Sequence, residues 1–419
     1  MNFLENGRKV KVAVIGLGIR GRVLMKSLVE MADVQVVAVC DMLEERLELA
    51  LEIVRENSGA CGYTPEDVLV TTDYKEVLGR EDVEAIINAS SWQVHHRITI
   101  AALEAGKHVG MEVGGANSVQ ECWDMVRAAE RSGKFCMPIA NACYCREEMT
   151  LINMVRQGLF GEVVHCQGGY GHDRRTQIGK GDIEKQYRQL NFTKRNGELY
   201  PMHAIGYISK ILGINRGNRM LSLISVSSKA AGLHQWYADN RPDTPFAKQQ
   251  INQGDIVNTL IKCANGETIS LTHDCSLPRP YSRLGGVHGT RGLWVEDKGA
   301  YHLEKTAPWD DTIEAEWHPF EEAMEQYEPK LWKDFRASGK TGTHGGSDYL
   351  VLRAFVETVQ NQDIPPVDVY DAALWTAITC LSEESIATGG FVGVPDFTNG
   401  RWMNRGDDVC TADYSFDSL

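Results

Sequence analysis

The chain has 419 residues, of which 43% are hydrophobic and 24% are charged, and its formal net charge is −14. This length exceeds what a single hydrophobic core commonly organises, so two domains are expected. The negative charge disfavours nucleic acid and anionic membranes as partners. No apolar run approaches the roughly 18 residues of a membrane span, so we expect a globular protein without a membrane partner.

The N-terminus and the cysteines indicate a reducing compartment. No apolar segment or cleavage site precedes the first predicted strand, which predicts a cytoplasmic protein, or a periplasmic one if an export signal has been trimmed away. The eleven cysteines are scattered among apolar residues, as is typical of reduced, buried thiols. Cys143 and Cys145 lack a second pair at zinc-site spacing, so no metal site is expected.

Within a predicted domain over 1–145, residues 9–145 alternate strands and helices with the rhythm of parallel βαβ units. The predicted strands cover 9–16, 34–41, 83–90, 108–113 and 135–140, and helices are predicted over 20–31, 43–56 and 118–131. Short apolar strands separated by helices are buried on both faces of a sheet. This domain is therefore predicted to be α/β, with a doubly wound parallel sheet.

The pattern changes after residue 146. Strands are predicted over 163–172, 256–263, 268–274 and 292–297, and a further strand includes 226–229. Asn265-Gly266 between two of them is a strong hairpin signal. Long helices are predicted over 349–360 and 369–387. We expect an α+β domain over 146–405 with a mainly antiparallel sheet, followed by a loose acidic tail over 406–419.

A glycine-rich turn, Gly16-Leu17-Gly18-Ile19-Arg20-Gly21, joins the first strand to the first helix. Its glycines suit a tight turn, a close backbone approach to pyrophosphate and close helix packing, and the helix N-terminus attracts phosphate. Asp41 ends the second strand twenty residues later, where a carboxylate binds a ribose 2′-hydroxyl and repels a 2′-phosphate. A tight turn without ligand is the alternative. Together these features predict a Rossmann domain that binds NAD.

Two further features of this domain leave alternatives open. The guanidinium of Arg20 could pair with the 2′-phosphate of NADP as well as with the pyrophosphate of NAD. His95 and His96 could suggest a metal, but no carboxylate or histidine follows either of them four residues later. Packing at the cofactor pocket or at a helix start is the preferred interpretation of both histidines.

Residues 108–113 read His-Val-Gly-Met-Glu-Val and resemble the segment in which Gfo/Idh/MocA oxidoreductases carry a Glu-Lys-Pro motif. In dehydrogenases of that family, the lysine helps to remove the hydroxyl proton. Val113 occupies the lysine position here, and valine has no proton chemistry. This departure argues against an ordinary dehydrogenase.

Motifs through nearly the whole remaining chain resemble one group of that superfamily more closely. They lie at 168–173, 194–203, 215–219, 276–281, 289–294, 344–349, 369–373 and 395–398. In this order they resemble the NAD-dependent glycosidases of glycoside hydrolase family 109, the α-N-acetylgalactosaminidases. Because the motifs are polar and irregular, the resemblance is specific to this group. Proteins of this fold often form homo-oligomers, so a dimer or larger assembly is expected by analogy.

The resemblance implies residues for both ligands. Together with the turn glycines Gly16, Gly18 and Gly21, the NAD site would include Ile19, Arg20, Asp41, Trp92, Gln93, His95, Glu112, Val113 and Asn141. The sugar would contact Tyr170, Arg188, Tyr200, Pro201, Met202, His203 and Tyr281. The group's Tyr-Pro-Thr-His-Gly motif reads Tyr-Pro-Met-His-Ala here. The lost threonine hydroxyl at Met202 points to a different or broader glycoside range.

In such glycosidases the sugar is oxidised transiently at C3, which acidifies the proton at C2, and the aglycone leaves by elimination before water adds and the ketone is reduced again. His203 is the predicted base, because imidazole titrates near neutral pH and the residue lies near a predicted helix start. Tyr200 and Tyr281 could relay protons, bind hydroxyls or stack on the sugar. The alternatives are a structural histidine and core tyrosines.

Other side chains have two interpretations each. Arg188 could donate paired hydrogen bonds to the sugar or form a surface ion pair. Glu383 and Glu384 are predicted to form one solvated helix face, not a catalytic pair. Trp236, Trp294 and Trp317 are candidates for either the core or sugar stacking.

Three classes of function remain open. The first is an NAD-dependent glycosidase that acts on a small-molecule or glycan substrate and recycles its cofactor. The second is an NAD-dependent sugar dehydrogenase, which Val113 disfavours. The third is a non-catalytic sensor on the same scaffold, which Tyr200, His203 and Tyr281 disfavour.

Overall fold

The computed structural model describes residues 8–185, 187–304, 315–406, 410 and 413–415. The chain divides into two compact units. The first comprises Met1–Met149, Pro329–Leu374 and Asp407–Leu419, and the second comprises Thr150–Glu328 and Trp375–Gly406. Residues 329–374, assigned from the sequence to the second domain, thus belong to the first unit.

The first unit contains a six-stranded sheet in which every pair of neighbours is parallel. Its strands are β1 (Val10–Ile15), β2 (Val34–Cys40), β3 (Leu69–Thr71), β4 (Ala85–Asn88), β5 (His108–Met111) and β6 (Cys136–Pro138). Their order is β3-β2-β1-β4-β5-β6, so the strand order reverses between β1 and β4. The predicted doubly wound sheet is confirmed, and ligands bind such sheets beyond the carboxyl ends of the strands at that reversal.

Helices connect these strands. They are α1 (Ile19–Val29), α2 (Glu44–Cys61), α3 (Tyr74–Leu78), α4 (Trp92–Glu104) and α5 (Val119–Ser132). In α5, buried Cys122, Met125, Val126 and Ala129 recur at helical spacing and form the stripe that faces the core. Ser118 caps this helix by accepting a hydrogen bond from the backbone N–H of Glu121 at 3.2 Å.

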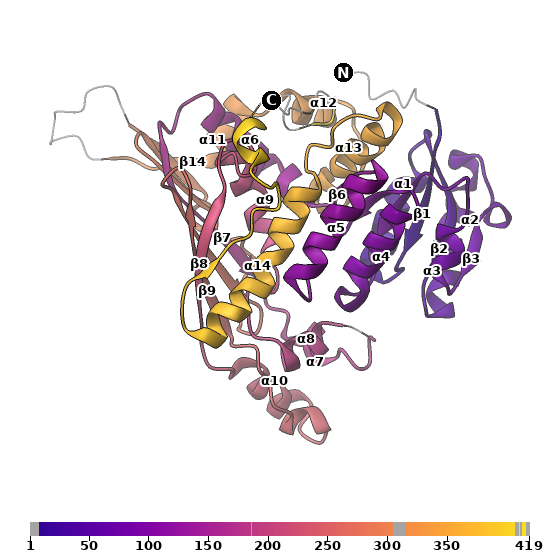
Figure 1. The fold of residues 1–419 in the computed structure, drawn as a ribbon, viewed down its shortest axis with the longest axis horizontal. Coiled ribbons are helices and arrows are strands. Elements are labelled where there is room, and N and C mark those ends of the chain that lie inside the picture. The colour runs from indigo at the N-terminus through magenta and orange to yellow at the C-terminus, as the bar shows by residue number, and fades with distance from the viewer. Residues whose placement is uncertain (1–7, 186, 305–314, 407–409, 411–412, 416–419) are drawn as a thin grey trace. The chain divides into compact units, whose positions relative to one another are not determined.

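A late segment completes the first unit with α12 (Lys330–Ala337) and α13 (Ser347–Asn361). In Figure 1, the orange ribbon of α13 lies among the indigo and purple elements of this unit. A buried ion pair between Arg353 Nη1 and Asp33 Oδ1, at 2.6 Å, links α13 to the segment that follows α1. The predicted tail falls largely outside the described residues, but the buried Tyr414 donates its backbone N–H to Glu357 at 3.0 Å.

The second unit contains a nine-stranded sheet in the order β14-β13-β12-β11-β7-β10-β9-β8-β15. The strands are β7 (Val163–Gly171), β8 (Met220–Ser227), β9 (Ile256–Cys263), β10 (Thr268–Asp274), β11 (Gly286–Gly289), β12 (Gly292–Val295), β13 (Ala300–Leu303), β14 (His318–Pro319) and β15 (Val392–Gly393). Among the described strands of this sheet, β7 and β10 alone pair in parallel, which confirms the mainly antiparallel prediction. The strand expected to include 226–229 is β8, which begins at Met220 and ends at Ser227, so residues 228 and 229 lie beyond it.

The helices of the second unit include α7 (Arg175–Gly179), α8 (Arg188–Lys194), α9 (Met202–Ile211), α10 (Gly232–Asn240) and α11 (Phe320–Tyr327). Two more, α6 (Arg146–Arg156) and α14 (Val369–Thr388), run across the boundary between the units. Helix α9 packs closely on β7, since a Cβ atom at Gly168 would lie 2.6 Å from the Cβ of Ala204. This close approach brings the end of β7 and the start of α9 together.

The ten cysteines whose side chains the structure describes are all free thiols, as expected. No helix in the described part of the chain is long and apolar enough to cross a membrane.

Candidate functional site

The glycine-rich turn of the first unit lies where the strand order reverses. A Cβ atom at Gly16 would come within 2.5 Å of the backbone of Ala89, which follows β4, and Gly16 has a φ of +90°. At Gly21 a Cβ atom would lie 1.8 Å from the carbonyl oxygen of Gly16. At Gly18, by contrast, it would meet only the guanidinium of Arg46, at 3.8 Å. The first and third glycines are therefore needed for packing, whereas the second leaves the backbone open to a ligand.

Asp41 secures this turn from the end of β2. Its carboxylate accepts the backbone N–H of Leu17 at 2.7 Å and that of Leu43 at 3.0 Å. A carboxylate offers about four acceptor sites, so it retains capacity for ribose hydroxyls. The apolar side chains of Ile19, which begins α1, and of Met42, which follows Asp41, are exposed. The predicted adenosine contacts Ile19 and Asp41 thus lie at one edge of the sheet.

Arg20 is held by carboxylates of its own unit. Its Nη1 and Nη2 each donate to an oxygen of Asp348 at 2.7 Å, and its Nε lies 3.2 Å from Glu112 Oε1. Two carboxylates thus balance the charge of the guanidinium, which weakens the case for a 2′-phosphate partner and favours NAD. Burial raises the pKa of Glu112, while the nearby Arg20 opposes that rise.

Side chains at the start of α4 form hydrogen bonds with the backbone of the segment after β5. Trp92 donates its indole N–H to the carbonyl oxygen of Val113 at 3.2 Å, and His95 Nε2 lies 2.7 Å from that of Glu112. Burial lowers the pKa of His95 to about 4, so the ring is neutral and donates through Nε2. No group of three potential metal ligands occurs among the described residues, and His95 lies buried on the first turn of α4.

Two observations indicate that the residues of the first unit fit NAD. Glu112 Oε2 is a buried oxygen with no hydrogen-bond partner among the described residues, and a bound nucleotide can supply one. The open backbone at Gly18 fits a pyrophosphate. Of the other predicted contacts, Asn141 is buried at the start of a 3₁₀ turn and Gln93 is half-buried on the first turn of α4.

The second unit brings four of the predicted sugar-binding rings together. The ring of Tyr170, near the end of β7, lies 4.3 Å from that of Tyr200 and 5.6 Å from that of His203. The rings of Tyr200 and His203 are 4.9 Å apart, and that of Tyr281 is 6.1 Å from Tyr170. We call these four residues the aromatic cluster. Tyr281 is 48% exposed, so the cluster is open to solvent on that side.

Arg188, Pro201 and Met202 are all buried beside or within this segment. Arg188 does not lie at the surface, and its guanidinium lies over the ring of Tyr200, 5.0 Å from the ring centre. Met202 starts α9 with a buried side chain, and His203, half-buried, is its second residue. The predicted helix start at His203 is therefore confirmed.

Two further polar side chains, His172 and Arg174, hold the hydroxyl of Tyr170. Arg174 Nη2 donates to it at 3.1 Å, and His172 Nδ1 lies 3.1 Å away. Burial, together with the positive charges of Arg174 and Arg188, lowers the pKa of His172 to about 4. His172 is therefore neutral at physiological pH, and the phenol has a fixed orientation.

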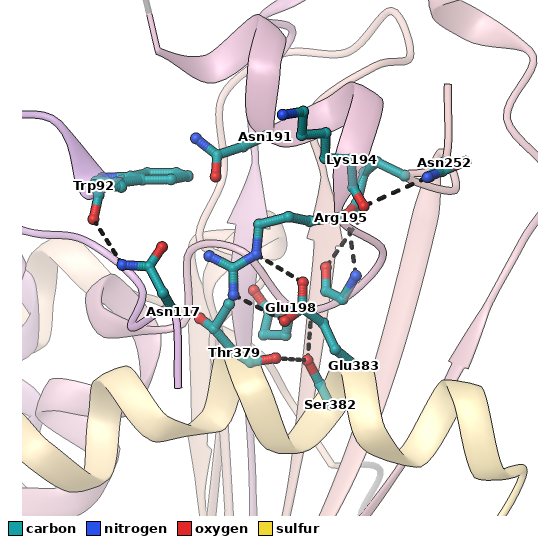
Figure 2. Close-up of polar contacts among 12 residues, drawn as sticks. Trp92, Asn117, Asn191, Lys194, Arg195, Glu198, Asn252, Thr379, Ser382 and Glu383 are labelled. Carbon is teal, nitrogen blue, oxygen red and sulfur yellow. Dashed lines mark hydrogen bonds and ion pairs between the residues drawn. The ribbon is translucent and has the colours of Figure 1, made fainter. Parts of the chain in front are cut away.

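The loop before Tyr200 is tied to α14, as Figure 2 shows, and also to Gln253. Arg195 forms a bidentate ion pair with Glu383, at 2.7 and 2.8 Å. The backbone N–H of Glu198 donates to the hydroxyl of Ser382 at 2.8 Å, and both backbone groups of Gly197 bond Gln253. Of the two glutamates predicted to form a solvated face, Glu384 is exposed, whereas Glu383 is partly exposed and pairs with Arg195.

Glu198 is a buried carboxyl group that the sequence did not single out. Its side chain is fully buried, Oε1 accepts the backbone N–H of Tyr200 at 3.3 Å, and Oε2 has no hydrogen-bond partner among the described residues. Burial raises the pKa of Glu198 to about 8. The only signal in the sequence is its position two residues before Tyr200, within the motif at 194–203.

Replacing Glu198 with glutamine should flatten the dependence of folding stability on pH. Between about pH 4.5 and about 8 the folded chain keeps the proton of Glu198 while the unfolded chain loses it. The free energy of unfolding therefore falls as the pH rises, by at most about 1.4 kcal/mol per pH unit. Urea unfolding measured from pH 5 to pH 8 should show the free energy of unfolding of Glu198→Gln rising relative to that of the wild type as the pH increases. Parallel curves would contradict this, and Glu384→Gln, on the exposed face of α14, is the matched control.

The three tryptophans differ in their environments. Trp294 is fully buried, which identifies it as a core residue, and Trp236 is almost so. Trp317 is exposed, with the ammonium of Lys298 over its ring at 4.9 Å from the centre. None of them has a ring contact with the aromatic cluster among the described residues.

Comparison with known families gives two matches that together cover most of the chain. Residues 144–404 match the model described as glycosyl hydrolase 109, C-terminal domain. Residues 10–139 match the Gfo/Idh/MocA model, described as an oxidoreductase family with an NAD-binding Rossmann fold.

Relatives of this chain resemble it over nearly its whole length. A glycosyl hydrolase family 109 protein of Stenotrophomonas maltophilia is 40% identical, covering 95% of this chain and 91% of that protein. An alpha-N-acetylgalactosaminidase of Tannerella forsythia is 37% identical, covering 94% and 88%. Among solved structures, an NAD binding oxidoreductase from Klebsiella pneumoniae has a TM-score of 0.69 at 15% identity, covering 92% of this chain and 99% of that one. Levoglucosan dehydrogenase in complex with NADH has a TM-score of 0.64 at 19% identity, covering 93% and 100%. At these identities the solved structures establish the fold.

Proposed function

Because this chain belongs to glycosyl hydrolase family 109, we propose that it cleaves α-N-acetylgalactosaminides or a broader range of glycosides by transient oxidation and elimination. The chain is a glycosidase of the Gfo/Idh/MocA fold, and its first unit binds NAD. The relative from Tannerella forsythia named alpha-N-acetylgalactosaminidase supports this substrate class.

The observation that carries the proposed mechanism is the side chain at position 113. Val113 is 4% exposed and occupies the position at which the dehydrogenases of this superfamily carry their proton-accepting lysine. The first unit therefore lacks that proton carrier, whereas the second unit has an imidazole and three phenols in its aromatic cluster. Proton chemistry concentrated in the second unit suits elimination better than a net dehydrogenation.

When bound, NAD would supply reversible acceptance of hydride from C3 of the sugar, with no net oxidation. A phenol of the aromatic cluster would take up the C3 hydroxyl proton and return it on re-reduction. His203 removes the C2 proton, which the C3 ketone has acidified. The electrons of the C2–H bond form a C1–C2 double bond as the bond from C1 to the aglycone oxygen breaks, and Tyr200 or Tyr281 protonates that oxygen. Water then adds at C1 and gives a proton to that phenolate, while His203, whose proton has exchanged with solvent, protonates C2. Arg188 and the phenol of Tyr170 orient the sugar hydroxyls.

The breadth of the substrate range follows from two substitutions at the start of α9. Met202 replaces a threonine of the group's motif and has a buried side chain, so no hydroxyl is available there. Ala204 replaces a glycine, and its methyl group packs against Gly168 of β7. A pocket with one hydroxyl fewer discriminates less between an N-acetyl group and other substituents at C2.

A panel of α- and β-nitrophenyl glycosides, supplied to the NAD-loaded protein without added cofactor, tests this function. Nitrophenol release over many turnovers, without accumulation of NADH absorbance, is expected for at least one N-acetylgalactosaminide or related glycoside. Stoichiometric NADH without cleavage would identify a sugar dehydrogenase instead. Neither product across the panel would favour a non-catalytic role.

A further inference from the structure

Asp348 lies at the second position of α13, within a motif that the proposed function does not use. Its side chain is fully buried. It accepts hydrogen bonds from both Nη atoms of Arg20 and from His344 Nδ1, each at 2.7 Å, and from the hydroxyl of Thr343. Burial alone would raise the pKa of Asp348, but the hydrogen bonds from His344 and Arg20 hold it well below its usual value. Asp348 is therefore a permanent anion.

The backbone before α13 is shaped so that these donors can reach Asp348. His344, Gly345 and Gly346 all have positive φ angles, of 51°, 68° and 106°. The chain thus turns back over the first turn of the helix and places Thr343 and His344 beside the carboxylate. A non-glycine residue in this conformation is strained, and the hydrogen bond of His344 to Asp348 offsets part of that strain.

Asp348 fixes the orientation of the Arg20 guanidinium. It belongs to the first turn of α1, directly beyond the open backbone at Gly18. Asp348 engages both Nη atoms and Glu112 engages Nε, so the guanidinium plane has one orientation. A guanidinium carries five N–H groups, and these three contacts leave two for a ligand. A side chain fixed before the ligand arrives loses less conformational entropy on binding.

We propose that Asp348 is a positioning residue of the cofactor site, which fixes the guanidinium of Arg20 beside the glycine-rich turn and thereby sets how tightly NAD is held. The inference rests on the NAD-binding first unit and is independent of which bond the enzyme cleaves. The proposal gives a role to the late segment 329–374, because the carboxylate that orients Arg20 of α1 comes from α13.

A second buried ion pair in the same unit provides a matched control. Arg353, also on α13, pairs with Asp33 at 2.6 Å, and Asp33 follows the far end of α1. Since an eleven-residue helix is about 16 Å long, this pair lies well away from the glycine-rich turn. Breaking either pair should destabilise the unit, but only the pair at Arg20 should affect the cofactor.

The test is the dissociation constant of NAD for the full-length protein, measured by titration calorimetry, with thermal unfolding of each variant alongside. Asp348→Asn should weaken NAD binding by roughly tenfold to a hundredfold, because hydrogen bonds to charged groups contribute that much. Asp33→Asn should lower the unfolding midpoint while leaving the dissociation constant unchanged. Arg20→Ala should weaken binding at least as much as Asp348→Asn, and the double variant no further than Arg20→Ala alone.

If Asp348→Asn does not fold, Arg20→Lys serves in its place, since lysine keeps the charge but cannot form the bidentate pair. Weaker NAD binding by a folded Arg20→Lys protein supports the proposal. An unchanged dissociation constant in either variant, additive effects in the double variant, or equal weakening by Asp33→Asn would overturn it. Because the readout is NAD binding, a failure here is distinct from a failure to cleave glycosides.

Discussion

Replacing His203 with glutamine is expected to lower the turnover of glycoside hydrolysis by about a hundredfold to ten-thousandfold, the usual contribution of a general base. His203 is the half-buried second residue of α9, and its ring lies 4.9 Å from that of Tyr200 and 5.6 Å from that of Tyr170. Glutamine preserves polarity and approximate size but cannot accept a proton at neutral pH. Nitrophenol release by the NAD-loaded variant measures the loss.

His172→Gln is the matched control for that prediction. His172 belongs to the same region, with its ring 4.9 Å from that of Tyr281, but its lowered pKa and its contact with the hydroxyl of Tyr170 indicate an orienting role. This variant should lose less turnover than His203→Gln. The dissociation constant of NAD should be the same in both variants. Full hydrolytic activity in His203→Gln would remove His203 from the mechanism.

The second large effect is expected at the glycine-rich turn, where two alanine substitutions should separate folding from cofactor binding. Gly21→Ala would place a methyl group 1.8 Å from the carbonyl oxygen of Gly16, which is backbone and cannot move aside cheaply. We expect it to lower the free energy of unfolding by roughly 1–3 kcal/mol or more and to abolish NAD binding.

Gly18→Ala should behave differently. Gly18 has a φ of −59°, which alanine adopts without strain, and its Cβ atom would meet only Arg46, at 3.8 Å. Stability should change by about 1 kcal/mol or less, since the residue only caps α1. NAD binding should nevertheless weaken strongly, because the methyl group occupies the side from which the pyrophosphate approaches. Denaturant unfolding and calorimetry on both variants measure the two effects. Unchanged NAD affinity in Gly18→Ala would show that the cofactor does not approach this backbone.

Features encoded by neighbouring residues could be predicted from the sequence. The strand, turn and helix around Gly16–Gly21 form a local pattern, and Asn265-Gly266 specified the hairpin between β9 and β10. The candidate site was predicted in part for the same reason. His203 and Tyr200 share one segment, and the structure brings Tyr170 and Tyr281 to them as the resemblance implied.

Features that depend on distant residues could not be predicted. Residues 329–374 return to the first unit through contacts with residues far away in the sequence. Arg353, for example, pairs with Asp33, which lies more than three hundred residues earlier. The parallel pairing of β7 with β10 is likewise set by the whole sheet. Glu198 reads as an ordinary charged residue in the sequence, and only its burial in the folded unit shows that it keeps its proton.

The central claim is that glycosides are cleaved by removal and return of the C2 proton. Hydrolysis of an unlabelled nitrophenyl glycoside in deuterium oxide, followed by NMR spectroscopy of the released sugar, tests it most directly. Elimination predicts carbon-bound deuterium at C2, because the proton that returns there comes from the solvent. A released sugar that keeps all of its original hydrogen at C2 would contradict the claim and indicate direct displacement at C1.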